Sequence, residues 1–364
     1  MTSAERVAVV GTGLIGTSIA MAAVRAGDAV RGFDADPDTL ARAAERSGLV
    51  PALSARECVQ GATIVFVCTP IPSLAGLVTE ALAAAPEAVV SDVGSVKSHV
   101  TEQVEAEADP SHLPRFVGGH PMGGSERSGP DRASPSVVDG IVWVLCGTDR
   151  TDPAAIERLT GWVERVGASP VLMSAERHDR LVAVVSHLPQ VASTALMGLA
   201  ATEEAGEPEI LLLAAGGFRD LTRLAASSPR LWSDILLANR DQIAHAIELY
   251  ADRLLAMRDM VLGERAAEVE DAFATAKRAR LALTAKPQVK AGVAVIQVPI
   301  PDRPGVLAEL TTALGEASVN IEDLQIVHSP EGGRGTVHLT VAIDAAEVAE
   351  GILRERWFEP LRLA

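Results

Sequence analysis

The feature that most constrains the fold of this chain is a glycine-rich loop, Gly11–Gly16 (GTGLIG), which directly follows the apolar run Val7–Val10. The first glycine permits a tight turn, the second lets backbone N–H groups approach a pyrophosphate, and the third allows close helix–strand packing. The helix that begins here adds partial positive charge near the phosphates. The loop predicts a Rossmann-like dinucleotide-binding domain in which Gly11, Gly13, Leu14, Ile15 and Gly16 contact the cofactor.

An acidic residue extends this site. Asp34 ends the next apolar run, at about the distance from the loop that dinucleotide-binding folds use. A carboxylate there accepts hydrogen bonds from the ribose hydroxyls of NAD and repels the extra phosphate of NADP, so NAD is the predicted cofactor. The alternative is that Asp34 and Asp36 belong to a solvated turn. Thr69 and Pro70, after the run Ile64–Cys68, complete the predicted cofactor contacts.

The pattern of the chain predicts three domains. Short β-branched runs alternate with Ala-rich helical stretches over residues 1–174, as in an α/β fold with a parallel, helix-covered sheet. Residues 175–285 have helical periodicity, for example over Ile235–Met260 and Ala266–Leu283, and predict an all-α domain. Its several apolar faces favour a homodimer. After a linker at 286–291, residues 292–364 follow a βαββαβ order, which predicts a ferredoxin-like α+β domain.

Composition narrows the classes of partner. The net charge of −16 argues against a nucleic-acid-binding surface, which would concentrate Lys and Arg, and favours a small-molecule substrate. The three cysteines form no C-x-x-C pair, as is typical of a reducing compartment. A basic-then-apolar leader and a long apolar run are both lacking in the sequence, so we expect a cytoplasmic protein that does not insert into a membrane.

Four further motifs carry candidate chemistry. Asp92–Lys97 (DVGSVK) and Gly118–Glu126 (GGHPMGGSE) follow predicted strands, and ligands bind at the carboxyl ends of parallel strands. Ser186–Pro189 (SHLP) and Gly216–Arg223 (GGFRDLTR) lie in the predicted helical domain. We therefore expect a cleft between the two domains. The pattern of His, Cys and Asp residues has no metal-ligand spacing, so no metal is expected.

With these motifs in this order, residues 7–285 resemble the prephenate/arogenate dehydrogenase family. The resemblance implies an NAD-dependent oxidative decarboxylation in tyrosine biosynthesis, in which hydride leaves the hydroxyl-bearing ring carbon and loss of the ring carboxylate yields an aromatic ring. It implies that His120 accepts the hydroxyl hydrogen bond, that Ser95 beside it contacts both the substrate hydroxyl and the nicotinamide region of the cofactor, and that Arg223 holds the ring carboxylate. Imidazole and guanidinium suit these two tasks.

The resemblance also implies active-site roles for Glu126, His187, Asp220 and Trp232, with His187 and Glu126 near the side-chain end of the substrate. The alternatives are purely structural roles: His187 could cap a helix break, Asp220 could pair with a neighbouring arginine, and Trp232 could belong to the core. The remaining histidines considered are interpreted as surface or structural residues: His99, His112, His178 and His245.

The motifs leave two substrates open. Many prephenate-preferring relatives have a second histidine after SHLP, where this chain has Gln190. Prephenate is the first expectation and arogenate the alternative. A β-hydroxyacid dehydrogenase would be expected to have a catalytic lysine in the helical domain. That class is disfavoured because the lysines of this region, Lys277 and Lys286, lie near its end. A non-catalytic NAD or amino-acid sensor is disfavoured because Ser95, His120 and Arg223 are all present.

Residues 292–364 resemble an ACT domain, a small-molecule sensor of amino-acid biosynthetic enzymes. The resemblance implies an amino-acid effector, and we hypothesise feedback control by tyrosine. The alternative is that the domain only strengthens the dimer. The residues predicted to bind the effector are Asp302, Pro304, Gly305, Val306, Asn320 and Ile321.

Overall fold

The computed structural model describes residues 4–123, 129–204, 207, 209–284, 293–301, 303–328 and 334–363. The chain divides into two compact units, one made of Met1–Met197 with Leu224–Leu249 and the other of Gly198–Arg223 with Tyr250–Ala364. The bounds of the three domains inferred from the sequence therefore stay a prediction.

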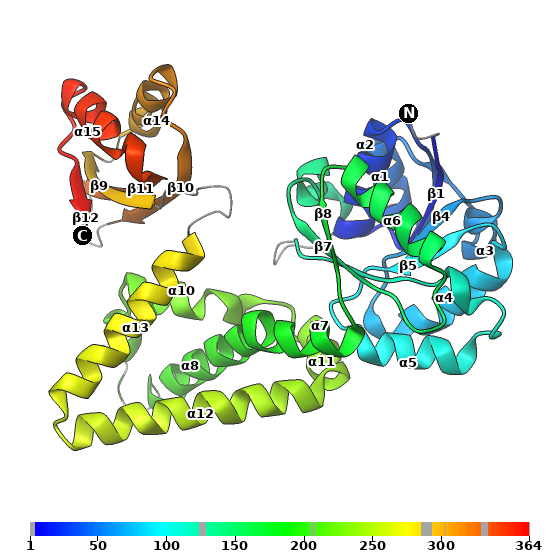
Figure 1. The fold of residues 1–364 in the computed structure, drawn as a ribbon, viewed down its shortest axis with the longest axis horizontal. Coiled ribbons are helices and arrows are strands. Elements are labelled where there is room, and N and C mark those ends of the chain that lie inside the picture. The colour runs from blue at the N-terminus through cyan, green and yellow to red at the C-terminus, as the bar shows by residue number, and fades with distance from the viewer. Residues whose placement is uncertain are drawn as a thin grey trace. The chain divides into compact units, whose positions relative to one another are not determined.

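A five-stranded parallel sheet in the order β3-β2-β1-β4-β5 organises the first unit (Figure 1). Its strands are β1 (Arg6–Val10), β2 (Ala29–Phe33), β3 (Val50–Pro51), β4 (Ile64–Val67) and β5 (Val89–Asp92). The helices that follow them are α1 (Leu14–Arg25), α2 (Pro37–Ser47), α3 (Ala55–Val59), α4 (Ile71–Ala84) and α5 (Ser98–Glu107). The predicted Rossmann-like fold is confirmed, and the strand order reverses between β1 and β4, where such sheets bind ligands.

Three further strands form a second sheet, β6 (Gly118–Pro121), β7 (Val142–Cys146) and β8 (Ser169–Leu172). The expectation that these strands are also parallel is wrong for one pair, since β6 and β7 run antiparallel while β7 and β8 are parallel. The chain between β6 and β7 contains the short 3-10 helices η2 (Pro130–Arg132) and η3 (Pro135–Val137), whereas β7 and β8 are joined by the full helix α6 (Pro153–Arg165). A parallel pair needs such a crossover.

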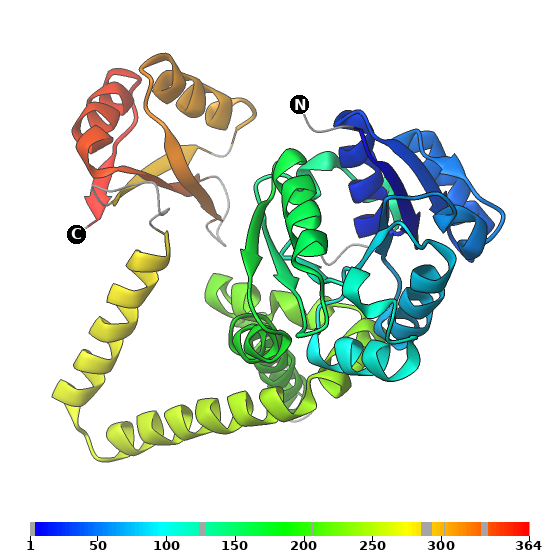
Figure 2. The ribbon, with the colours of Figure 1, turned by 45° about the vertical axis from the view of Figure 1, so that its right-hand side comes forward.

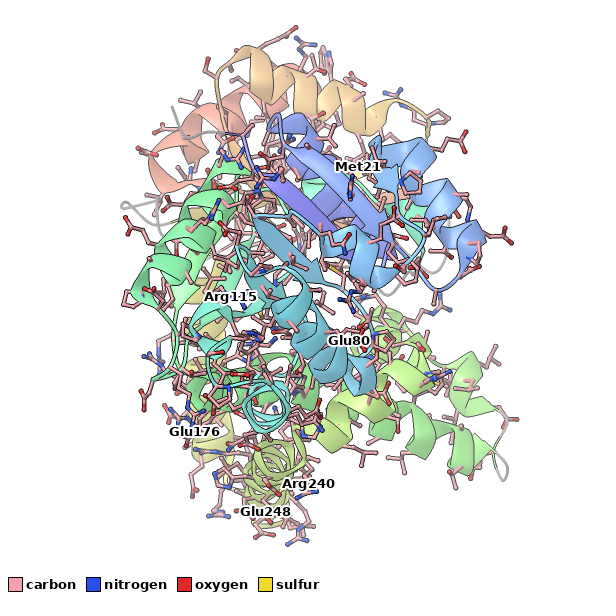
Figure 3. All side chains as sticks on the ribbon, turned by 90° about the vertical axis from the view of Figure 1, so that its right-hand side faces the viewer. Met21, Glu80, Arg115, Glu176, Arg240 and Glu248 are labelled. Atoms are coloured by element: carbon pink, nitrogen blue, oxygen red, sulfur yellow. The ribbon has the colours of Figure 1, made fainter. Side chains whose placement is uncertain are left out.

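Arg115 aligns the two sheets with α4. Its guanidinium donates to the carbonyl oxygens of Leu82, Ala85 and Ala88 at the end of that helix (Figure 3). The next residue, Phe116, makes a parallel bridge with Val90 beside β5. The side chain therefore caps the orphan carbonyls of α4 and fixes where β6 begins.

Apolar side chains fill both faces of the main sheet. One core cluster includes Leu74 and Val78 of α4, and the other includes Phe66, Trp143 and Trp162. The three aromatic rings lie 4.6–6.0 Å apart, centroid to centroid. This packing holds β4, β5 and β7 rigidly, and those strands support the loops of the candidate site.

Helices dominate the segment from Ala175 to Thr284. They are α7 (Ala175–Val182), the π-helix η4 (Ala183–His187), α8 (Leu188–Glu204), α9 (Glu209–Leu212), α10 (Gly216–Thr222), the 3-10 helix η5 (Arg223–Ala226), α11 (Pro229–Ala238), α12 (Arg240–Leu262) and α13 (Ala266–Thr284). The helical periodicity over Ile235–Met260 is confirmed, but it spans two helices, because α11 ends before Asn239 and α12 begins after it.

The C-terminal part folds as βαββαβ, as predicted. It comprises β9 (Val293–Pro301), α14 (Val306–Glu316), β10 (Ile321–His328), β11 (Arg334–Ala342), α15 (Ala346–Glu355) and β12 (Leu361–Leu363). The strands pair antiparallel in the order β10-β11-β9-β12, and both helices cover one face of the sheet (Figure 2). Leu310, Leu339 and Leu353 are fully buried between these layers.

Within the described residues, one helical segment, Ala175–Thr202, is long and apolar enough to pass a test for membrane-crossing helices based on length and composition. It contains the buried pair His178 and Asp179. Core helices of soluble proteins pass the same test.

Candidate active site

The three loop glycines differ in the space around them. A Cβ atom on Gly11 would lie 2.6 Å from the carbonyl oxygen of Cys68, and one on Gly16 would lie 1.9 Å from the carbonyl oxygen of Gly11. A Cβ atom on Gly13 would meet nothing within 4 Å. Gly11 also has a φ of 92°, which side chains disfavour. The loop is therefore closed on its protein side and open at Gly13, as a phosphate cradle at the start of α1 requires.

The Asp34 carboxylate is anchored beside this loop. One oxygen accepts from the backbone N of Thr12 at 2.7 Å and from its hydroxyl at 3.2 Å, and the other accepts from the backbone N of Asp36 at 3.0 Å. A carboxylate has about four acceptor positions, so some remain for ribose hydroxyls. The buried hydroxyl of Thr69 has no hydrogen-bond partner. An open cradle, an anchored acid and an unpartnered hydroxyl fit NAD.

A hydrogen-bonded chain of three side chains begins at His120 on β6. Its Nδ1 lies 2.8 Å from Nε2 of His178, and His178 Nδ1 lies 2.8 Å from Oδ1 of Asp179. Asp179 also accepts from the backbone N atoms of Lys97 and Ser98, each at 2.8 Å. His178, for which the sequence indicates only a surface or structural role, is 1% exposed and contacts His120 directly.

A buried ion pair, Lys97 with Asp92, lies beside this series of hydrogen-bonded side chains. Lys97 is fully buried, and its ammonium contacts the Asp92 carboxylate and donates to the carbonyl oxygen of Gly119 at 2.7 Å. Because Gly119 precedes His120, the pair ties the loop after β5 to β6. Ser95, half-buried, lies in that loop between the two partners. A buried charge needs such pairing, since desolvation alone costs several kcal/mol.

These surroundings keep His120 neutral. Burial lowers the pKa of His120 well below its usual value, and the nearby His178, Lys97 and His187 lower it further. Asp179 behaves oppositely: burial raises its pKa, but hydrogen bonds from His178, Lys97 and Ser98 outweigh that effect and the net pKa is lowered. The hydrogen-bonded series therefore has the ionised carboxylate of Asp179 at one end and the uncharged imidazole of His120 at the other.

The π-helix η4 presents His187. Pro189 has no N–H and cannot donate to the carbonyl four residues earlier, so an ordinary α-helix would be strained here. The wider π turn over Ala183–His187 absorbs that defect and lets α7 continue into α8. The alternative that His187 caps a helix break therefore does not hold.

His187 is only 1% exposed, and Asn239 fixes its protonation. The Asn239 Nδ2 atom donates to the carbonyl oxygen of Asp179 at 2.9 Å and lies 3.2 Å from His187 Nδ1. A carbonyl oxygen only accepts, so the Asn239 amide nitrogen is the group that faces Asp179, and the same nitrogen has a second hydrogen to donate to His187 Nδ1. Burial lowers the pKa of His187 to about 4. His187 is thus neutral with its proton on Nε2, and Trp232 packs edge-on against it at 6.0 Å.

Gln190 bonds to the protein chain itself. Its Nε2 donates to the carbonyl oxygen of Leu224 at 2.8 Å, and its Oε1 accepts from the Ser227 hydroxyl at 3.3 Å. The hydroxyl of Ser193, one turn along α8, accepts from the backbone N of Ala225 at 3.1 Å. These bonds attach η5 to α8 directly after Arg223.

The remaining predicted site residues fall in the second unit or outside the described residues. Asp220 is on α10 and Arg223 begins η5, both in the second unit, and Glu126 falls outside the described residues. Of the predicted effector residues, Asp302 is also outside them. Gly305, with a φ of 88°, caps α14 between Pro304 and Val306, while Asn320 donates to Glu322 and precedes Ile321.

The sequence did not single out Asp179 or Asn239, and it placed Asp92 and Lys97 at the two ends of a candidate motif without indicating a role for either. Little in the sequence indicates Asp179, because the stretch Ala175–Val182 is rich in charged residues and a His-Asp pair there resembles part of a solvated face. Within the described residues, no group of three or more His, Cys, Asp or Glu is arranged to hold a metal ion.

The cradle, the anchored acid and the histidine cluster define a Rossmann-type dehydrogenase. Three family models match the chain: the prephenate dehydrogenase nucleotide-binding domain at residues 19–172, the prephenate dehydrogenase dimerization domain at 174–275 and the ACT domain at 294–356. These matches follow the order of the regions predicted from the sequence.

Two relatives match this chain over nearly their whole length. The chain is 33% identical to prephenate dehydrogenase of Bacillus subtilis over 93% of both chains, and 32% identical to cyclohexadienyl dehydrogenase of Zymomonas mobilis over 78% of this chain and 97% of that one. The chain belongs to the prephenate dehydrogenase family, in a form with a C-terminal ACT domain. It is an NAD-dependent dehydrogenase.

Two solved structures are similar in fold. Prephenate dehydrogenase of Aquifex aeolicus, in complex with hydroxyphenyl propionate and NAD+, has a TM-score of 0.72 and 28% identity, covering 78% of this chain and 99% of that one. Arogenate dehydrogenase of Synechocystis has a TM-score of 0.67 and 29% identity, covering 76% and 98%. Relatives with different substrate names thus share this fold.

Proposed function

We propose that this protein is a prephenate dehydrogenase, which converts prephenate to 4-hydroxyphenylpyruvate in tyrosine biosynthesis. The observation that carries the proposal is the pair of neutral histidines, His120 and His187, held by separate hydrogen bonds. The similarity to the Bacillus subtilis enzyme over nearly the whole chain supports it.

His120 takes the hydroxyl proton in this reaction. NAD, when bound, accepts the hydride that leaves the ring carbon bearing the hydroxyl group. As the C–O bond becomes a carbonyl, the hydroxyl proton moves to His120, whose low pKa keeps it unprotonated and ready to accept. The ring carboxylate then leaves as CO2, its bonding electrons complete the aromatic ring, and the phenolate oxygen that results takes the proton back to give the hydroxyl group of the product.

Other side chains orient the substrate. Ser95, in the loop tied to β6, contacts the hydroxyl and nicotinamide region, and Arg223 holds the ring carboxylate with a permanently charged fork. Asp220, Trp232 and Glu126 complete the site. Gln190 acts indirectly through its bonds to Leu224 and Ser227, which set the backbone next to Arg223.

The proton on His187 favours prephenate over arogenate. Asn239 donates to His187 Nδ1, so the imidazole offers an Nε2–H donor. The keto oxygen of prephenate accepts such a bond, whereas the ammonium group of arogenate has only donors and would face another donor. A mismatched buried donor costs about 1–3 kcal/mol, which corresponds to roughly 5- to 150-fold in selectivity.

The ACT domain makes this activity responsive to tyrosine, and the helical region forms a homodimer in the cytoplasm. The match of residues 174–275 to a dimerization domain supports the dimer. So do exposed apolar side chains on α12 and α13, such as Leu254, Val261 and Phe273. Tyrosine must bind two states of the enzyme unequally to act as an inhibitor.

The test is NADH formation with prephenate and with arogenate, each with NAD and with NADP. We expect turnover with prephenate and NAD, inhibition by added tyrosine, and loss of turnover in His120→Asn. Asn239→Leu, which removes the donor to His187 Nδ1, should reduce the preference for prephenate more than it reduces kcat. Preference for arogenate in the unmodified protein would make it an arogenate dehydrogenase, and no turnover of either substrate would refute the proposal.

A further inference from the structure

Two buried groups beside His120 have no part in the reaction as written above. His178 is 1% exposed and Asp179 is 2% exposed, and both come from α7 rather than from the strands that carry the nucleotide site. Burying an imidazole and a carboxylate is costly unless they are paired, and here they are paired in line with His120. Their role, which rests on the proposed function, concerns the proton that His120 receives.

The hydrogen-bond partners assign one tautomer to each ring. Asp179 accepts two backbone N–H groups, which favours its ionised form, so it accepts from His178 Nδ1–H. With its Nδ1–H donated to Asp179, the His178 ring accepts at Nε2 from His120 Nδ1–H. The Nε2 atom of His120 is consequently left with a lone pair, which is the form a base needs.

We propose that His178 and Asp179 are positioning residues that fix His120 in this tautomer and receive the positive charge when it acts. The substrate hydroxyl proton moves to His120 Nε2, and the Nδ1 proton of His120 moves to His178 Nε2. His120 is neutral before and after the step. The charge resides on His178, whose Nδ1–H bonds to the Asp179 carboxylate.

Electrostatics favours the second imidazole over the first. Burial disfavours a cation on His120, and so do the neighbouring His178, Lys97 from the loop after β5 and His187 from η4. The negative groups are Asp92, which is paired with Lys97, and Asp179, which bonds to His178 rather than to His120. Cys146 on β7 is a neutral thiol, since burial raises its pKa to about 12. A proton on His178 is therefore adjacent to a carboxylate at 2.8 Å.

Substitutions at His178 separate the two parts of this role. In His178→Gln the side-chain oxygen still accepts from His120 Nδ1–H but takes up no proton. In His178→Leu the acceptor is also lost. We expect kcat with prephenate to fall about 100-fold in the first variant and further in the second, with KM for prephenate and NAD little changed. The exposed His245 provides the matched control, His245→Gln, which should leave all parameters unchanged.

The pH profile and a proton inventory exclude a merely structural role. The acid limb of kcat/KM should move to lower pH in His178→Gln, because the second imidazole no longer takes up a proton. In mixtures of H2O and D2O, the unmodified enzyme should show two protons in flight, and His178→Gln should show one. The D2O experiment on the unmodified protein also covers the case in which a variant does not fold.

The outcomes distinguish the two proposals. If the unmodified enzyme turns over neither substrate, the proposed function fails. If it turns over prephenate with a one-proton inventory, or if His178→Gln keeps kcat within about threefold with an unshifted pH profile, the proposed function stands and the relay is refuted.

Discussion

A single methyl group added at Gly13 or at Gly16 should have opposite consequences. At Gly13 the backbone has ordinary angles, φ −67° and ψ −160°, and the methyl group would meet no protein atom within 4 Å. At Gly16 it would lie 1.9 Å from the carbonyl oxygen of Gly11. The first substitution therefore tests the cofactor cradle, and the second tests the packing of α1 on β1.

The expected magnitudes follow from these distances. At Gly16, reaching an ordinary contact of 3.4 Å requires a displacement of at least 1.5 Å (3.4 − 1.9), which the packed helix resists. Gly16→Ala should cost about 1–3 kcal/mol of unfolding free energy. Gly13→Ala should change it by less than about 1 kcal/mol, but its methyl group keeps a phosphate from the loop N–H groups. Losing one bond to a charged group costs about 1.5–3 kcal/mol, or roughly 10- to 100-fold in NAD affinity.

Calorimetric titration with NAD and thermal unfolding without it, both on the full chain, measure the two effects separately. Gly13→Ala should unfold like the unmodified protein and bind NAD weakly, while Gly16→Ala should unfold at a lower temperature. Unchanged NAD affinity in a folded Gly13→Ala variant would refute the assignment of this loop as the phosphate cradle.

Two other predictions concern stability. His120 and His187 have pKa values below those of the unfolded chain, the latter at about 4, so they stabilise the fold fully above pH ~6.5 and lose that contribution as pH falls towards their folded values. Urea unfolding should show a loss of about 1.4 kcal/mol per pH unit for each histidine in that window, and an unchanged slope in His187→Gln would contradict this. Trp357 is 95% exposed and has a φ of 68° after α15, where glycine is preferred. Trp357→Gly should stabilise the ACT domain by about 1 kcal/mol, whereas Trp357→Ala should not, as thermal unfolding would show.

Sequence periodicity predicted the elements well but not all of their relations. The βαββαβ order and the helix Val306–Glu316 could be predicted because local propensity and pattern agree there. The antiparallel direction of β6 could not, because it depends on how the chain between Met122 and Val142 returns, and no local pattern encodes that. The role of Asn239 could not be predicted for a similar reason. The apolar spacing continues through this position, although α11 ends there and the Asn239 side chain donates to the carbonyl oxygen of Asp179.

In the candidate site, too, local motifs could be predicted from the sequence and contacts between distant segments could not. Its glycines, His120 and His187 belong to motifs, so they could be found from residue type and spacing. The partners of those histidines could not, because His178 is 58 positions from His120 along the chain and Asn239 is 52 positions from His187. Hydrogen bonds over such separations follow from the packing of α7 and α11, which sequence spacing does not determine.

Asp179 connects the two histidines of the site by different parts of the same residue. Its carboxylate acts through His178 on His120, and its backbone carbonyl acts through Asn239 on His187. One ring is thereby made an acceptor and the other a donor, although both are neutral imidazoles in one buried cluster. An Asp179 side-chain substitution should therefore alter proton transfer at His120 while leaving the donor on His187 in place. An Asn239 substitution should remove the donor on His187 and leave proton transfer at His120 unchanged. Asp179 therefore couples the chemistry at one histidine to the choice of substrate at the other, and it does so through His178 and Asn239.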